Sequence, residues 1–178
     1  MLSRVAVGLR PSVKDVVGQR VAGKIGSELH LPVTAVRIVK IFTIEGLSAA
    51  EAETVIASGV LHDPVVQSAS LLPLSPAPET TDWIIEVGFR PGVTDNEGRT
   101  AREAIALALE LSPERQKSLA VYTAVQYHIE GLPSRADAER VAVDLLSNDL
   151  LQRNDIKSRE TWQAEPGFPA RAAKVTGQ

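Results

Sequence analysis

Hydrophobic and polar residues along this chain follow two kinds of pattern, one typical of strands and one typical of helices. The stretches 4–10 and 83–90 alternate or run apolar in the manner of half-buried strands. Behind each of them, apolar residues recur at four-residue spacing, which is typical of an amphipathic helix. These residues are Val17, Val21, Ile25 and Leu29 in the first stretch and Ala101, Ile105 and Leu109 in the second. The pattern predicts a strand and then a helix at two places, with Asp15 and Asp95 as the helix N-caps.

Each predicted helix is followed by a second set of elements. Two β-branched runs each predict either one bent strand or a tight pair of strands. A second helix opens with Ser48 and Glu51 at the spacing of a capping box, and Ser134 and Asp137 play a similar part later in the chain. The remaining predicted elements are strands within 36–46, 64–72, 119–131 and 150–158, and helices over 47–61 and from 134 onward.

The two sets of elements also align with each other in sequence. "VGLRPSVKDVVGQRVAGKI" at 7–25 aligns without gaps on "VGFRPGVTDNEGRTAREAI" at 87–105, an offset of 80. Further on, "FTIEGL" matches "YHIEGL" and "LHDPVVQ" matches "LSNDLLQ", both at an offset of 85. The change of offset predicts an insertion of about five residues near 110–118 in the second copy. We interpret the pattern as an internal duplication.

The order of elements predicts an α+β fold made of two tandem, ferredoxin-like β-α-β-α-β repeats, with the helices on one face of an antiparallel sheet. A unit of about 60 to 70 residues is only marginally stable alone, so we expect the repeats to pack together as an intramolecular pseudo-dimer. The predicted boundaries are repeat 1 at 1–70, a proline-rich linker at 71–82, repeat 2 at 83–158 and an aperiodic tail or linker at 159–178.

The stretch "RPGVTDNEGR" at 90–99 has both a structural and a functional interpretation. Pro91 ends a strand, Gly92 suits the positive φ of a turn, and Asp95 suits an N-cap with Gly98 at the third helical position. Exposed amides at a helix start, beside arginines, would also suit an anion or a partner's carboxylate. Because the first copy lacks much of the polar excess, we predict a structural turn that also contributes to an interface.

The residues proposed for a partner interface come from this turn and from one strand. Arg37 and Lys40 are three residues apart, so they are expected on opposite faces of a strand unless a bulge intervenes. The full set of candidates is Arg90, Pro91, Gly92, Thr94, Asp95, Asn96, Arg99, Arg37 and Lys40.

Composition removes several classes of function. A formal net charge of −3 and the lack of a basic block argue against nucleic acid as a partner. The chain contains no cysteine, so it has neither a thiolate nucleophile nor a cysteine-ligated zinc site. His30, His62 and His128 do not have metal-ligand spacing, and we expect them at the surface or at an interface. No apolar stretch approaches the length of a membrane span, so we expect a soluble, cytoplasmic protein without a membrane partner.

The residues of the turn and its surroundings resemble a known family. "PGVTDNEG", the Arg37 and Lys40 strand and "LHDPVVQ" are similar to the small PurS subunit of phosphoribosylformylglycinamidine synthase, and still more to the duplicated PurS-like region that opens the long, single-chain, PurL-type form of that synthase. The resemblance covers about 4–157. Ser12 stands for the usual glycine in the first copy, and Asn148 with Asp149 replaces Asn-Pro in the second.

This resemblance implies a non-catalytic role in de novo purine biosynthesis. PurS-like domains bridge the glutaminase and the ATP-dependent synthetase and help to assemble the complex that transfers ammonia. The resemblance implies no cofactor in this chain, whereas ATP, Mg²⁺ and glutamine belong to the partner subunits or domains. A homodimer of the whole chain stays open. The lack of cysteine agrees independently, because a glutaminase of this type needs a cysteine nucleophile.

Two alternatives stay open at this point. Ferredoxin-like repeats of the ACT type bind amino acids between paired units, and in that case the turn at 92–98 would form the lip of the ligand site. A stand-alone enzyme that uses Asp95, His128 or the arginines is the other alternative.

Overall fold

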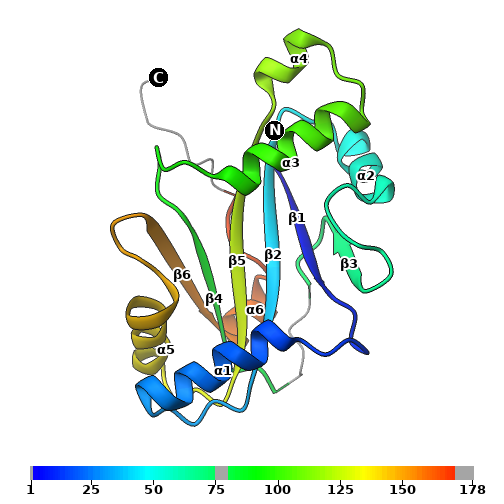
Figure 1. Cartoon of the computed structure of the whole chain (residues 1–178). Coiled ribbons are helices and arrows are strands. Elements are labelled where there is room, and N and C mark those ends of the chain that lie inside the picture. Colours follow the sequence, from blue (N-terminus) through cyan, green and yellow to red (C-terminus); the bar gives the residue numbers. More distant parts are fainter. Residues whose placement is uncertain (1, 75–79, 171–178) are drawn as a thin grey trace.

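The computed structural model describes residues 2–74 and 80–170. Within these residues, six strands form one antiparallel sheet in the order β3-β1-β2-β5-β4-β6 (Figure 1). The strands are β1 (Leu2–Leu9), β2 (Ala35–Glu45), β3 (Gln67–Ser70), β4 (Trp83–Phe89), β5 (Ala120–Glu130) and β6 (Gln152–Ser158). The helical segments are α1 (Val16–Leu29), α2 (Ala49–Ser58), α3 (Asn96–Ala108), α4 (Pro113–Ser118), α5 (Arg135–Val141), the π-helical turn η1 (Ala142–Leu146) and α6 (Arg159–Ala164).

The sheet consists of two similar halves, which we call the first half (2–74) and the second half (80–158). Each half has a central strand, β1 or β4, between a long strand and a short edge strand. The long strands β2 and β5 pair with each other along their whole length, from Ala35 opposite Glu130 to Glu45 opposite Ala120. This pairing joins the halves into one sheet, and it confirms the α+β prediction of two repeats packed as a pseudo-dimer.

Local signals in the sequence account for most element boundaries. The side chains of Asp15, Asp95, Ser48 and Ser134 each accept a hydrogen bond from a backbone amide at the start of a helix, as predicted, and Ser48 forms the full capping box with Glu51. Each long β-branched run forms one strand rather than a tight pair. The short helix α4 occupies the place of the predicted insertion.

The four long helical segments α1, α2, α3 and α5 cover one face of the sheet, but not in the way that two separate repeats would arrange them. Ile105 on α3 belongs to a core cluster with residues of β1, β2 and α2 of the first half and with Val121 on β5 of its own half. Ile25 and Leu29 on α1 belong to a core cluster with residues of β4, β5 and α5 of the second half and with Val36 on β2 of their own half. The first helix of each half therefore begins on the long strand of its own half and extends over the sheet of the other half (Figure 1).

The register of the strands explains this exchange of helices. The pairing of β1 with β2 ends at Gly8 opposite Val39, so residues 35–38 of β2 extend beyond β1 and pair only with β5. The chain leaves β1 beside Ile38 and must return to Ala35 through α1, a helix of 14 residues that spans about 21 Å. The helix therefore lies over the neighbouring half of the continuous sheet. None of the described helices is long and apolar enough to cross a membrane.

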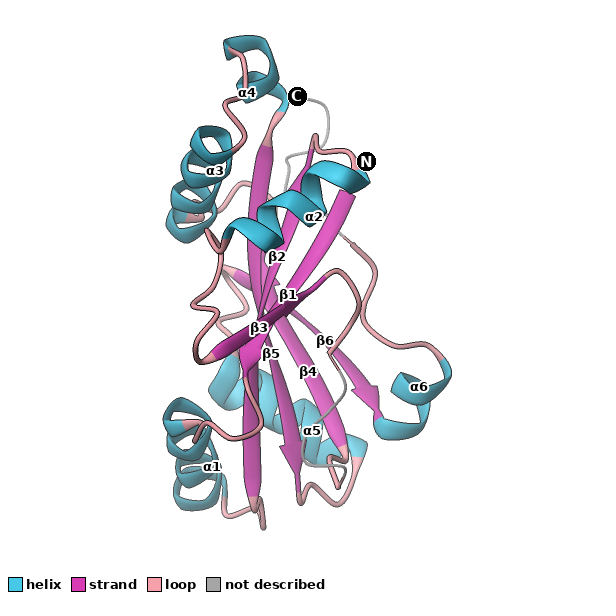
Figure 2. Ribbon diagram, turned by 90° about the vertical axis from the view of Figure 1, so that its right-hand side faces the viewer, coloured by secondary structure: helices cyan, strands magenta, loops and turns pink. Residues whose placement is uncertain are grey.

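The opposite face of the sheet is covered in part by the segment after β6 (Figure 2). The sequence predicted an aperiodic tail or linker at 159–178, and within the described part of this segment residues Arg159–Ala164 form α6. There, α6 places Trp162 against Ile84 and Phe168 in a small buried cluster. A helix of six residues is too short to show periodicity, and two aromatic anchors hold it instead. Residues 171–178 of the predicted tail and 75–79 of the predicted linker lie outside the described residues, and the bounds of the four predicted segments stay a prediction.

Candidate functional site

The two turns that precede α1 and α3 have the same construction. Asp15 accepts hydrogen bonds from the amides of Gly18, at 2.7 Å, and of Ile38 on β2, at 2.9 Å. Asp95 accepts from the amide of Gly98 at 2.8 Å and from the amide of Thr123 on β5 at 2.6 Å. Each aspartate therefore caps a helix and at the same time ties that helix to the neighbouring long strand. This double use explains why aspartate recurs at both positions.

The glycine three residues after each aspartate is required by close packing. A Cβ on Gly18 would lie 2.0 Å from the carbonyl oxygen of Val36, and a Cβ on Gly98 would lie 2.4 Å from that of Val121. No side chain fits at such distances from a backbone atom. The recurring Asp-x-x-Gly pattern is thus a structural requirement of the turn, as the structural interpretation of the sequence predicted.

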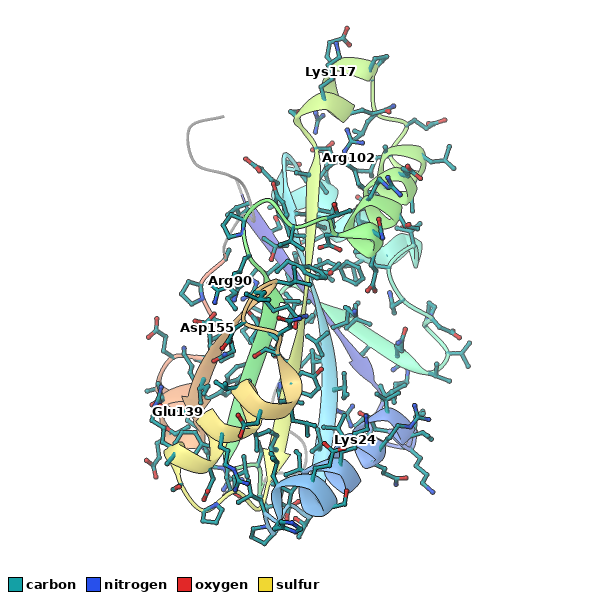
Figure 3. The ribbon with its side chains drawn as sticks, turned by 60° about the vertical axis from the view of Figure 1, so that its left-hand side comes forward. Lys24, Arg90, Arg102, Lys117, Glu139 and Asp155 are labelled. Atoms are coloured by element: carbon teal, nitrogen blue, oxygen red, sulfur yellow. The ribbon has the colours of Figure 1, made fainter. Side chains whose placement is uncertain are left out.

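The arginine before each turn also has a structural partner. Arg10 donates from its guanidinium to the carbonyl oxygen of Pro64, and Arg90 donates from Nε to that of Asp149 at 2.6 Å. The acceptor loops, at 61–67 and 146–152, are the repeated segments that end in glutamine, and they lead into β3 and β6. Figure 3 shows Arg90 at the end of β4, near the loop that it holds.

The structure brings most of the predicted interface residues together. Pro91, Gly92, Thr94, Asn96 and Arg99 are exposed, and Gly92 has the positive φ of 85° that the turn was expected to need. Lys40 lies beside them, because its Nζ is 2.7 Å from a carboxylate oxygen of Glu97 on α3.

Arg37 is the candidate that lies elsewhere. Its position opposite His128 in the register places it on the other face of the sheet from Lys40, as predicted for two strand residues three apart. None of these contacts tests whether the nine candidate residues bind a partner, and the interface stays a prediction.

Each turn borders a groove between its helix and the sheet. The second groove has a volume of about 240 Å³ and is lined by Lys40, Thr94, Asp95, Asn96, Glu97 and six neighbours on β4 and β5 as well as Gln152. The first groove has a volume of about 490 Å³ and its lining includes Val13, Lys14, Asp15, Gln19, Val36 and Arg37. The two grooves lie on different sides of equivalent turns, because their linings, apart from two residues of each turn, do not correspond at the offsets of 80 and 85, and they also differ in size.

A buried polar cluster on the opposite face of the sheet was not predicted from the sequence. Glu86 on β4 is fully buried and accepts a hydrogen bond from Arg4 at 2.6 Å and one from Gln126 at 3.1 Å. Arg153 on β6 lies 3.5 Å from its other carboxylate oxygen. Nothing in the sequence marks this charge as buried, because α6 and the residues after it, which cover this strand position, show no periodic pattern.

His128 belongs to the same buried cluster, so the expectation of a surface or interface histidine was wrong. Its side chain is fully buried, its Nε2 lies 3.0 Å from Oε1 of Gln126, and its ring forms a T-shaped contact with the ring of Trp162, with the ring centroids 5.4 Å apart. Burial, with a smaller contribution from the positive charge of Arg37, lowers the pKa of His128 to about 3. The imidazole is therefore neutral at physiological pH.

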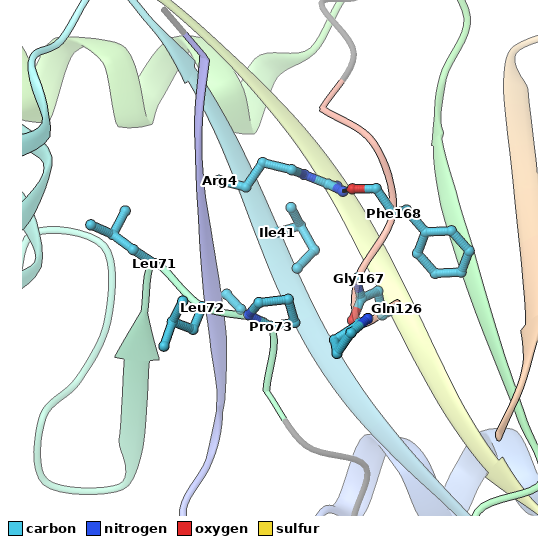
Figure 4. Close-up of a pocket in the computed structure, with 10 residues that line it drawn as sticks. Arg4, Ile41, Leu71, Leu72, Pro73, Gln126, Gly167 and Phe168 are labelled. Carbon is cyan, nitrogen blue, oxygen red and sulfur yellow. Dashed lines mark hydrogen bonds between the residues drawn. The ribbon is translucent and has the colours of Figure 1, made fainter. Parts of the chain in front are cut away.

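A small cavity lies beside this cluster, between the two halves (Figure 4). It has a volume of about 190 Å³. Arg4 and Gln126 line it together with Leu72, Pro73 and Phe168, and Arg4 also donates to the carbonyl oxygen of Phe168 at 2.7 Å. The linker after β3 and the segment after α6 therefore meet over the middle of the sheet.

The inserted helix α4 is tied to the first half by charge. Arg115 on α4 donates to the carboxylate of Glu51 on α2 at 2.8 Å, and this hydrogen bond lowers the pKa of Glu51 to about 2. In the part of the chain that the structure covers, no group of histidine, aspartate and glutamate side chains is arranged to hold a metal ion.

Comparison with protein families assigns the first half. Residues 2–72 match the model of the PurS family, described as phosphoribosylformylglycinamidine (FGAM) synthase. These residues include every element from β1 to β3, so the chain contains a PurS-like domain. No curated protein matches the chain. The second half repeats the order of strands and helices, with α4 added, but it lies beyond the matched residues, and its origin by duplication stays a prediction.

Proposed function

We propose that this chain is a non-catalytic, PurS-like component of phosphoribosylformylglycinamidine synthase in purine biosynthesis, and that it bridges the glutaminase and the ATP-dependent synthetase for ammonia transfer. The match of residues 2–72 to the PurS model carries this proposal. ATP, Mg²⁺ and glutamine are then substrates and cofactors of the partner subunits or domains. The absence of cysteine from the sequence supports this division, because the glutaminase nucleophile must come from another chain or domain.

The geometry of the chain suits a bridge between two partners. The exposed turns before α1 and α3 lie toward opposite ends of the sheet (Figure 1). Paired strands and exchanged helices connect the two turns, so their separation is fixed by the fold. A bridge needs two surfaces at a fixed separation, because the ammonia source and the site of its use must stay aligned.

The proposal is tested with the synthetase and the glutaminase of the same organism, assayed with and without this chain. We expect the chain to increase the rate of amidine formation when glutamine is the nitrogen source. When free ammonia replaces glutamine, we expect the chain to have little effect on this rate. An increase with both nitrogen sources would instead indicate support of the synthetase alone. No effect with either source, with both partners folded, would refute the proposed role.

A charge reversal at the predicted interface makes this test specific. Arg99→Glu changes an exposed side chain on α3 beside the second turn, and we expect it to reduce the gain with glutamine. Lys117→Glu on α4 is the matched control, since it reverses an exposed charge outside the predicted interface. Equal loss in both variants would mean that overall charge, and not this surface, is responsible.

An amino-acid-sensing domain of the ACT type is the alternative, and it would place its ligand between the halves or behind the turn at 92–98. The cavity beside Arg4 lies between the halves, where such a site is expected, but its 190 Å³ is below the range of about 300 to 1,000 Å³ that ligand pockets usually occupy. The groove behind the turn at 92–98 is similarly small, at about 240 Å³. Thermal melts with amino acids and nucleotides separate the two functions, because a sensor is stabilised by its ligand and a bridge by its partner chains.

A further inference from the structure

Each half has one loop that presents an aliphatic side chain to solvent. Val65, in the loop before β3, is 81% exposed, and Leu150, in the loop before β6, is 85% exposed. The two residues are equivalent at the offset of 85, and we call them the first tip and the second tip. A single exposed aliphatic residue is ordinary: Leu107 on α3 is 81% exposed, and a serine, Ser27, stands at its equivalent position. At the tips, by contrast, the exposed aliphatic side chain recurs in both halves.

The same hydrogen bonds hold both tips in place. Oδ1 of Asp63 accepts from the amide of Val65 at 3.0 Å, and Oδ1 of Asn148 accepts from the amide of Leu150 at 3.0 Å. The amides of Asp63 and Asn148 each donate to Oε1 of the glutamine that ends the loop, at 2.9 Å in both cases. The arginine before each turn binds the carbonyl oxygen of the residue that precedes the tip. Because the backbone at each tip is already fixed, a contact made there costs little conformational entropy.

The two tips belong to opposite edges of the sheet. They precede β3 and β6, which are the two edge strands (Figure 1). Five strand spacings, or about 24 Å along the sheet, separate these strands, so one pocket does not accept both tips. A single protruding side chain does not enclose a small molecule, and two of them on opposite edges do not form the continuous apolar face that a lipid surface needs. The matching surface for each tip is therefore an apolar pocket on another protein.

The residues next to the two tips differ in charge. Pro64 precedes Val65, whereas Asp149 precedes Leu150. Asp149 is exposed and holds Arg90 through its backbone carbonyl, and in the described part of the chain its carboxylate has no hydrogen-bond or ion-pair partner. A free carboxylate beside the second tip favours a cation at the rim of the pocket that receives it, whereas proline beside the first tip favours an uncharged rim. The two tips thus suit two different pockets.

We infer that Val65 and Leu150 are apolar anchors for two different partner proteins, and that a lysine or arginine lies at the rim of the pocket that receives Leu150. This inference rests on the proposed function and deepens it: one tip binds the glutaminase and the other binds the synthetase. Because both anchors are rigid and belong to opposite edges of one sheet, they hold the two partners at a fixed separation.

The inference is tested by replacing each tip with serine in the full chain. Val65→Ser and Leu150→Ser change exposed side chains and keep the backbone hydrogen bonds of the loops, so we expect both variants to melt like the wild type. The matched control is Leu107→Ser, which removes an equally exposed leucine from α3, outside both loops. Folding of each variant is checked by its thermal melt before binding is measured.

Binding to the purified glutaminase and to the purified synthetase is measured separately by isothermal titration calorimetry. We expect Leu150→Ser to bind one partner at least about tenfold more weakly, and Val65→Ser to bind the other partner more weakly by a similar factor, because each variant loses a buried aliphatic side chain. Leu107→Ser is expected to bind both partners like the wild type. Asp149→Asn is expected to weaken the complex formed through Leu150 and to reduce its dependence on salt, because an ion pair is lost.

Four outcomes contradict these ideas at different levels. If the wild type binds the partners and both tip variants bind them equally well, the anchors are wrong while the proposed function stands. If both tip variants weaken binding to the same partner, the assignment of one tip to each partner is wrong. If Asp149→Asn changes neither affinity nor salt dependence, the cation at the rim is wrong. If the wild type binds neither partner and leaves their activity unchanged, the proposed function fails, and self-association that Leu150→Ser abolishes in sedimentation experiments would then assign the second tip to another copy of this chain.

Discussion

The exchange of helices between the two halves can be tested by the stability of Ile105→Ala. Ile105 is fully buried on α3, and its neighbours in the core belong largely to β1, β2 and α2 of the first half. Truncation to alanine removes three buried carbon atoms and leaves a cavity, so we expect a loss of about 2 to 5 kcal/mol in the free energy of unfolding. The size of this loss alone does not show which half α3 stabilises.

A pair of double-mutant cycles identifies the half. Val55 on α2 belongs to the same core cluster as Ile105, and Val141 on α5 belongs to the other cluster, which contains Ile25 of α1. We expect Ile105→Ala and Val55→Ala to couple by about 0.5 to 3 kcal/mol, and Ile105→Ala and Val141→Ala to add within about 0.5 kcal/mol. The first pair spans both halves, whereas the second lies within one half.

The assay is urea unfolding followed by circular dichroism, with the free energy extrapolated from the linear dependence on urea. If a double variant is unfolded without urea, Ile105→Val takes the place of Ile105→Ala, at an expected cost of about 0.5 to 1.5 kcal/mol. Stronger coupling of Ile105 to Val141 than to Val55 would show that α3 packs on its own half, and the reasoning about the register of β2 would then be wrong.

Three further predictions follow from single contacts. Gly98→Ala is expected to lower the stability to urea, because the added Cβ would lie 2.4 Å from the carbonyl oxygen of Val121. Gly23→Ala, whose added Cβ has nothing within 4 Å, is expected to raise the free energy of unfolding by about 0.5 to 1 kcal/mol. Equal effects of the two variants would contradict the packing argument. Glu86→Ala leaves two largely buried arginines without this carboxylate, and we expect a loss of about 3 to 5 kcal/mol; an unchanged urea midpoint would refute it. His128 is protonated near pH 6.5 in the unfolded chain but only near pH 3 in the folded chain. The free energy of unfolding therefore decreases as the pH is lowered from 6.5 towards 3, by about 2 kcal/mol at pH 5. We expect His128→Gln to weaken the dependence of the unfolding free energy on pH between pH 7 and 5.

The local structure around the turns was predictable because its causes are local. An aspartate three residues before a glycine, and a serine three residues before a glutamate, satisfy amides of the same chain segment. The faces of Arg37 and Lys40 followed from the alternation of a strand alone. The predicted interface at 90–99 also gathers in one place, since it is a continuous segment and Lys40 is its one distant neighbour.

The contacts between distant segments were not predictable in the same way. Helical periodicity identifies the apolar face of α3, but it does not say that Ile105 packs on β1 and β2. The buried positions of Glu86 and His128 depend on two arginines from different strands and on Trp162 after β6. In the sequence, such residues look the same as an exposed glutamate and a surface histidine.

The sequence by itself determined the strands, the helices other than α4 and α6, the caps and the repetition of one unit, because hydrophobic periodicity and hydrogen bonding to near neighbours act within a few residues. The tertiary structure decided over which half each helix extends, which polar groups are buried, and that Lys40 and Glu97, from different halves, form an ion pair beside the second turn. These properties depend on the pairing of β2 with β5, which brings residues about 85 positions apart into contact. Whether a polar side chain at such a contact is buried and paired depends on both contacting segments, so the sequence of one segment alone does not predict it.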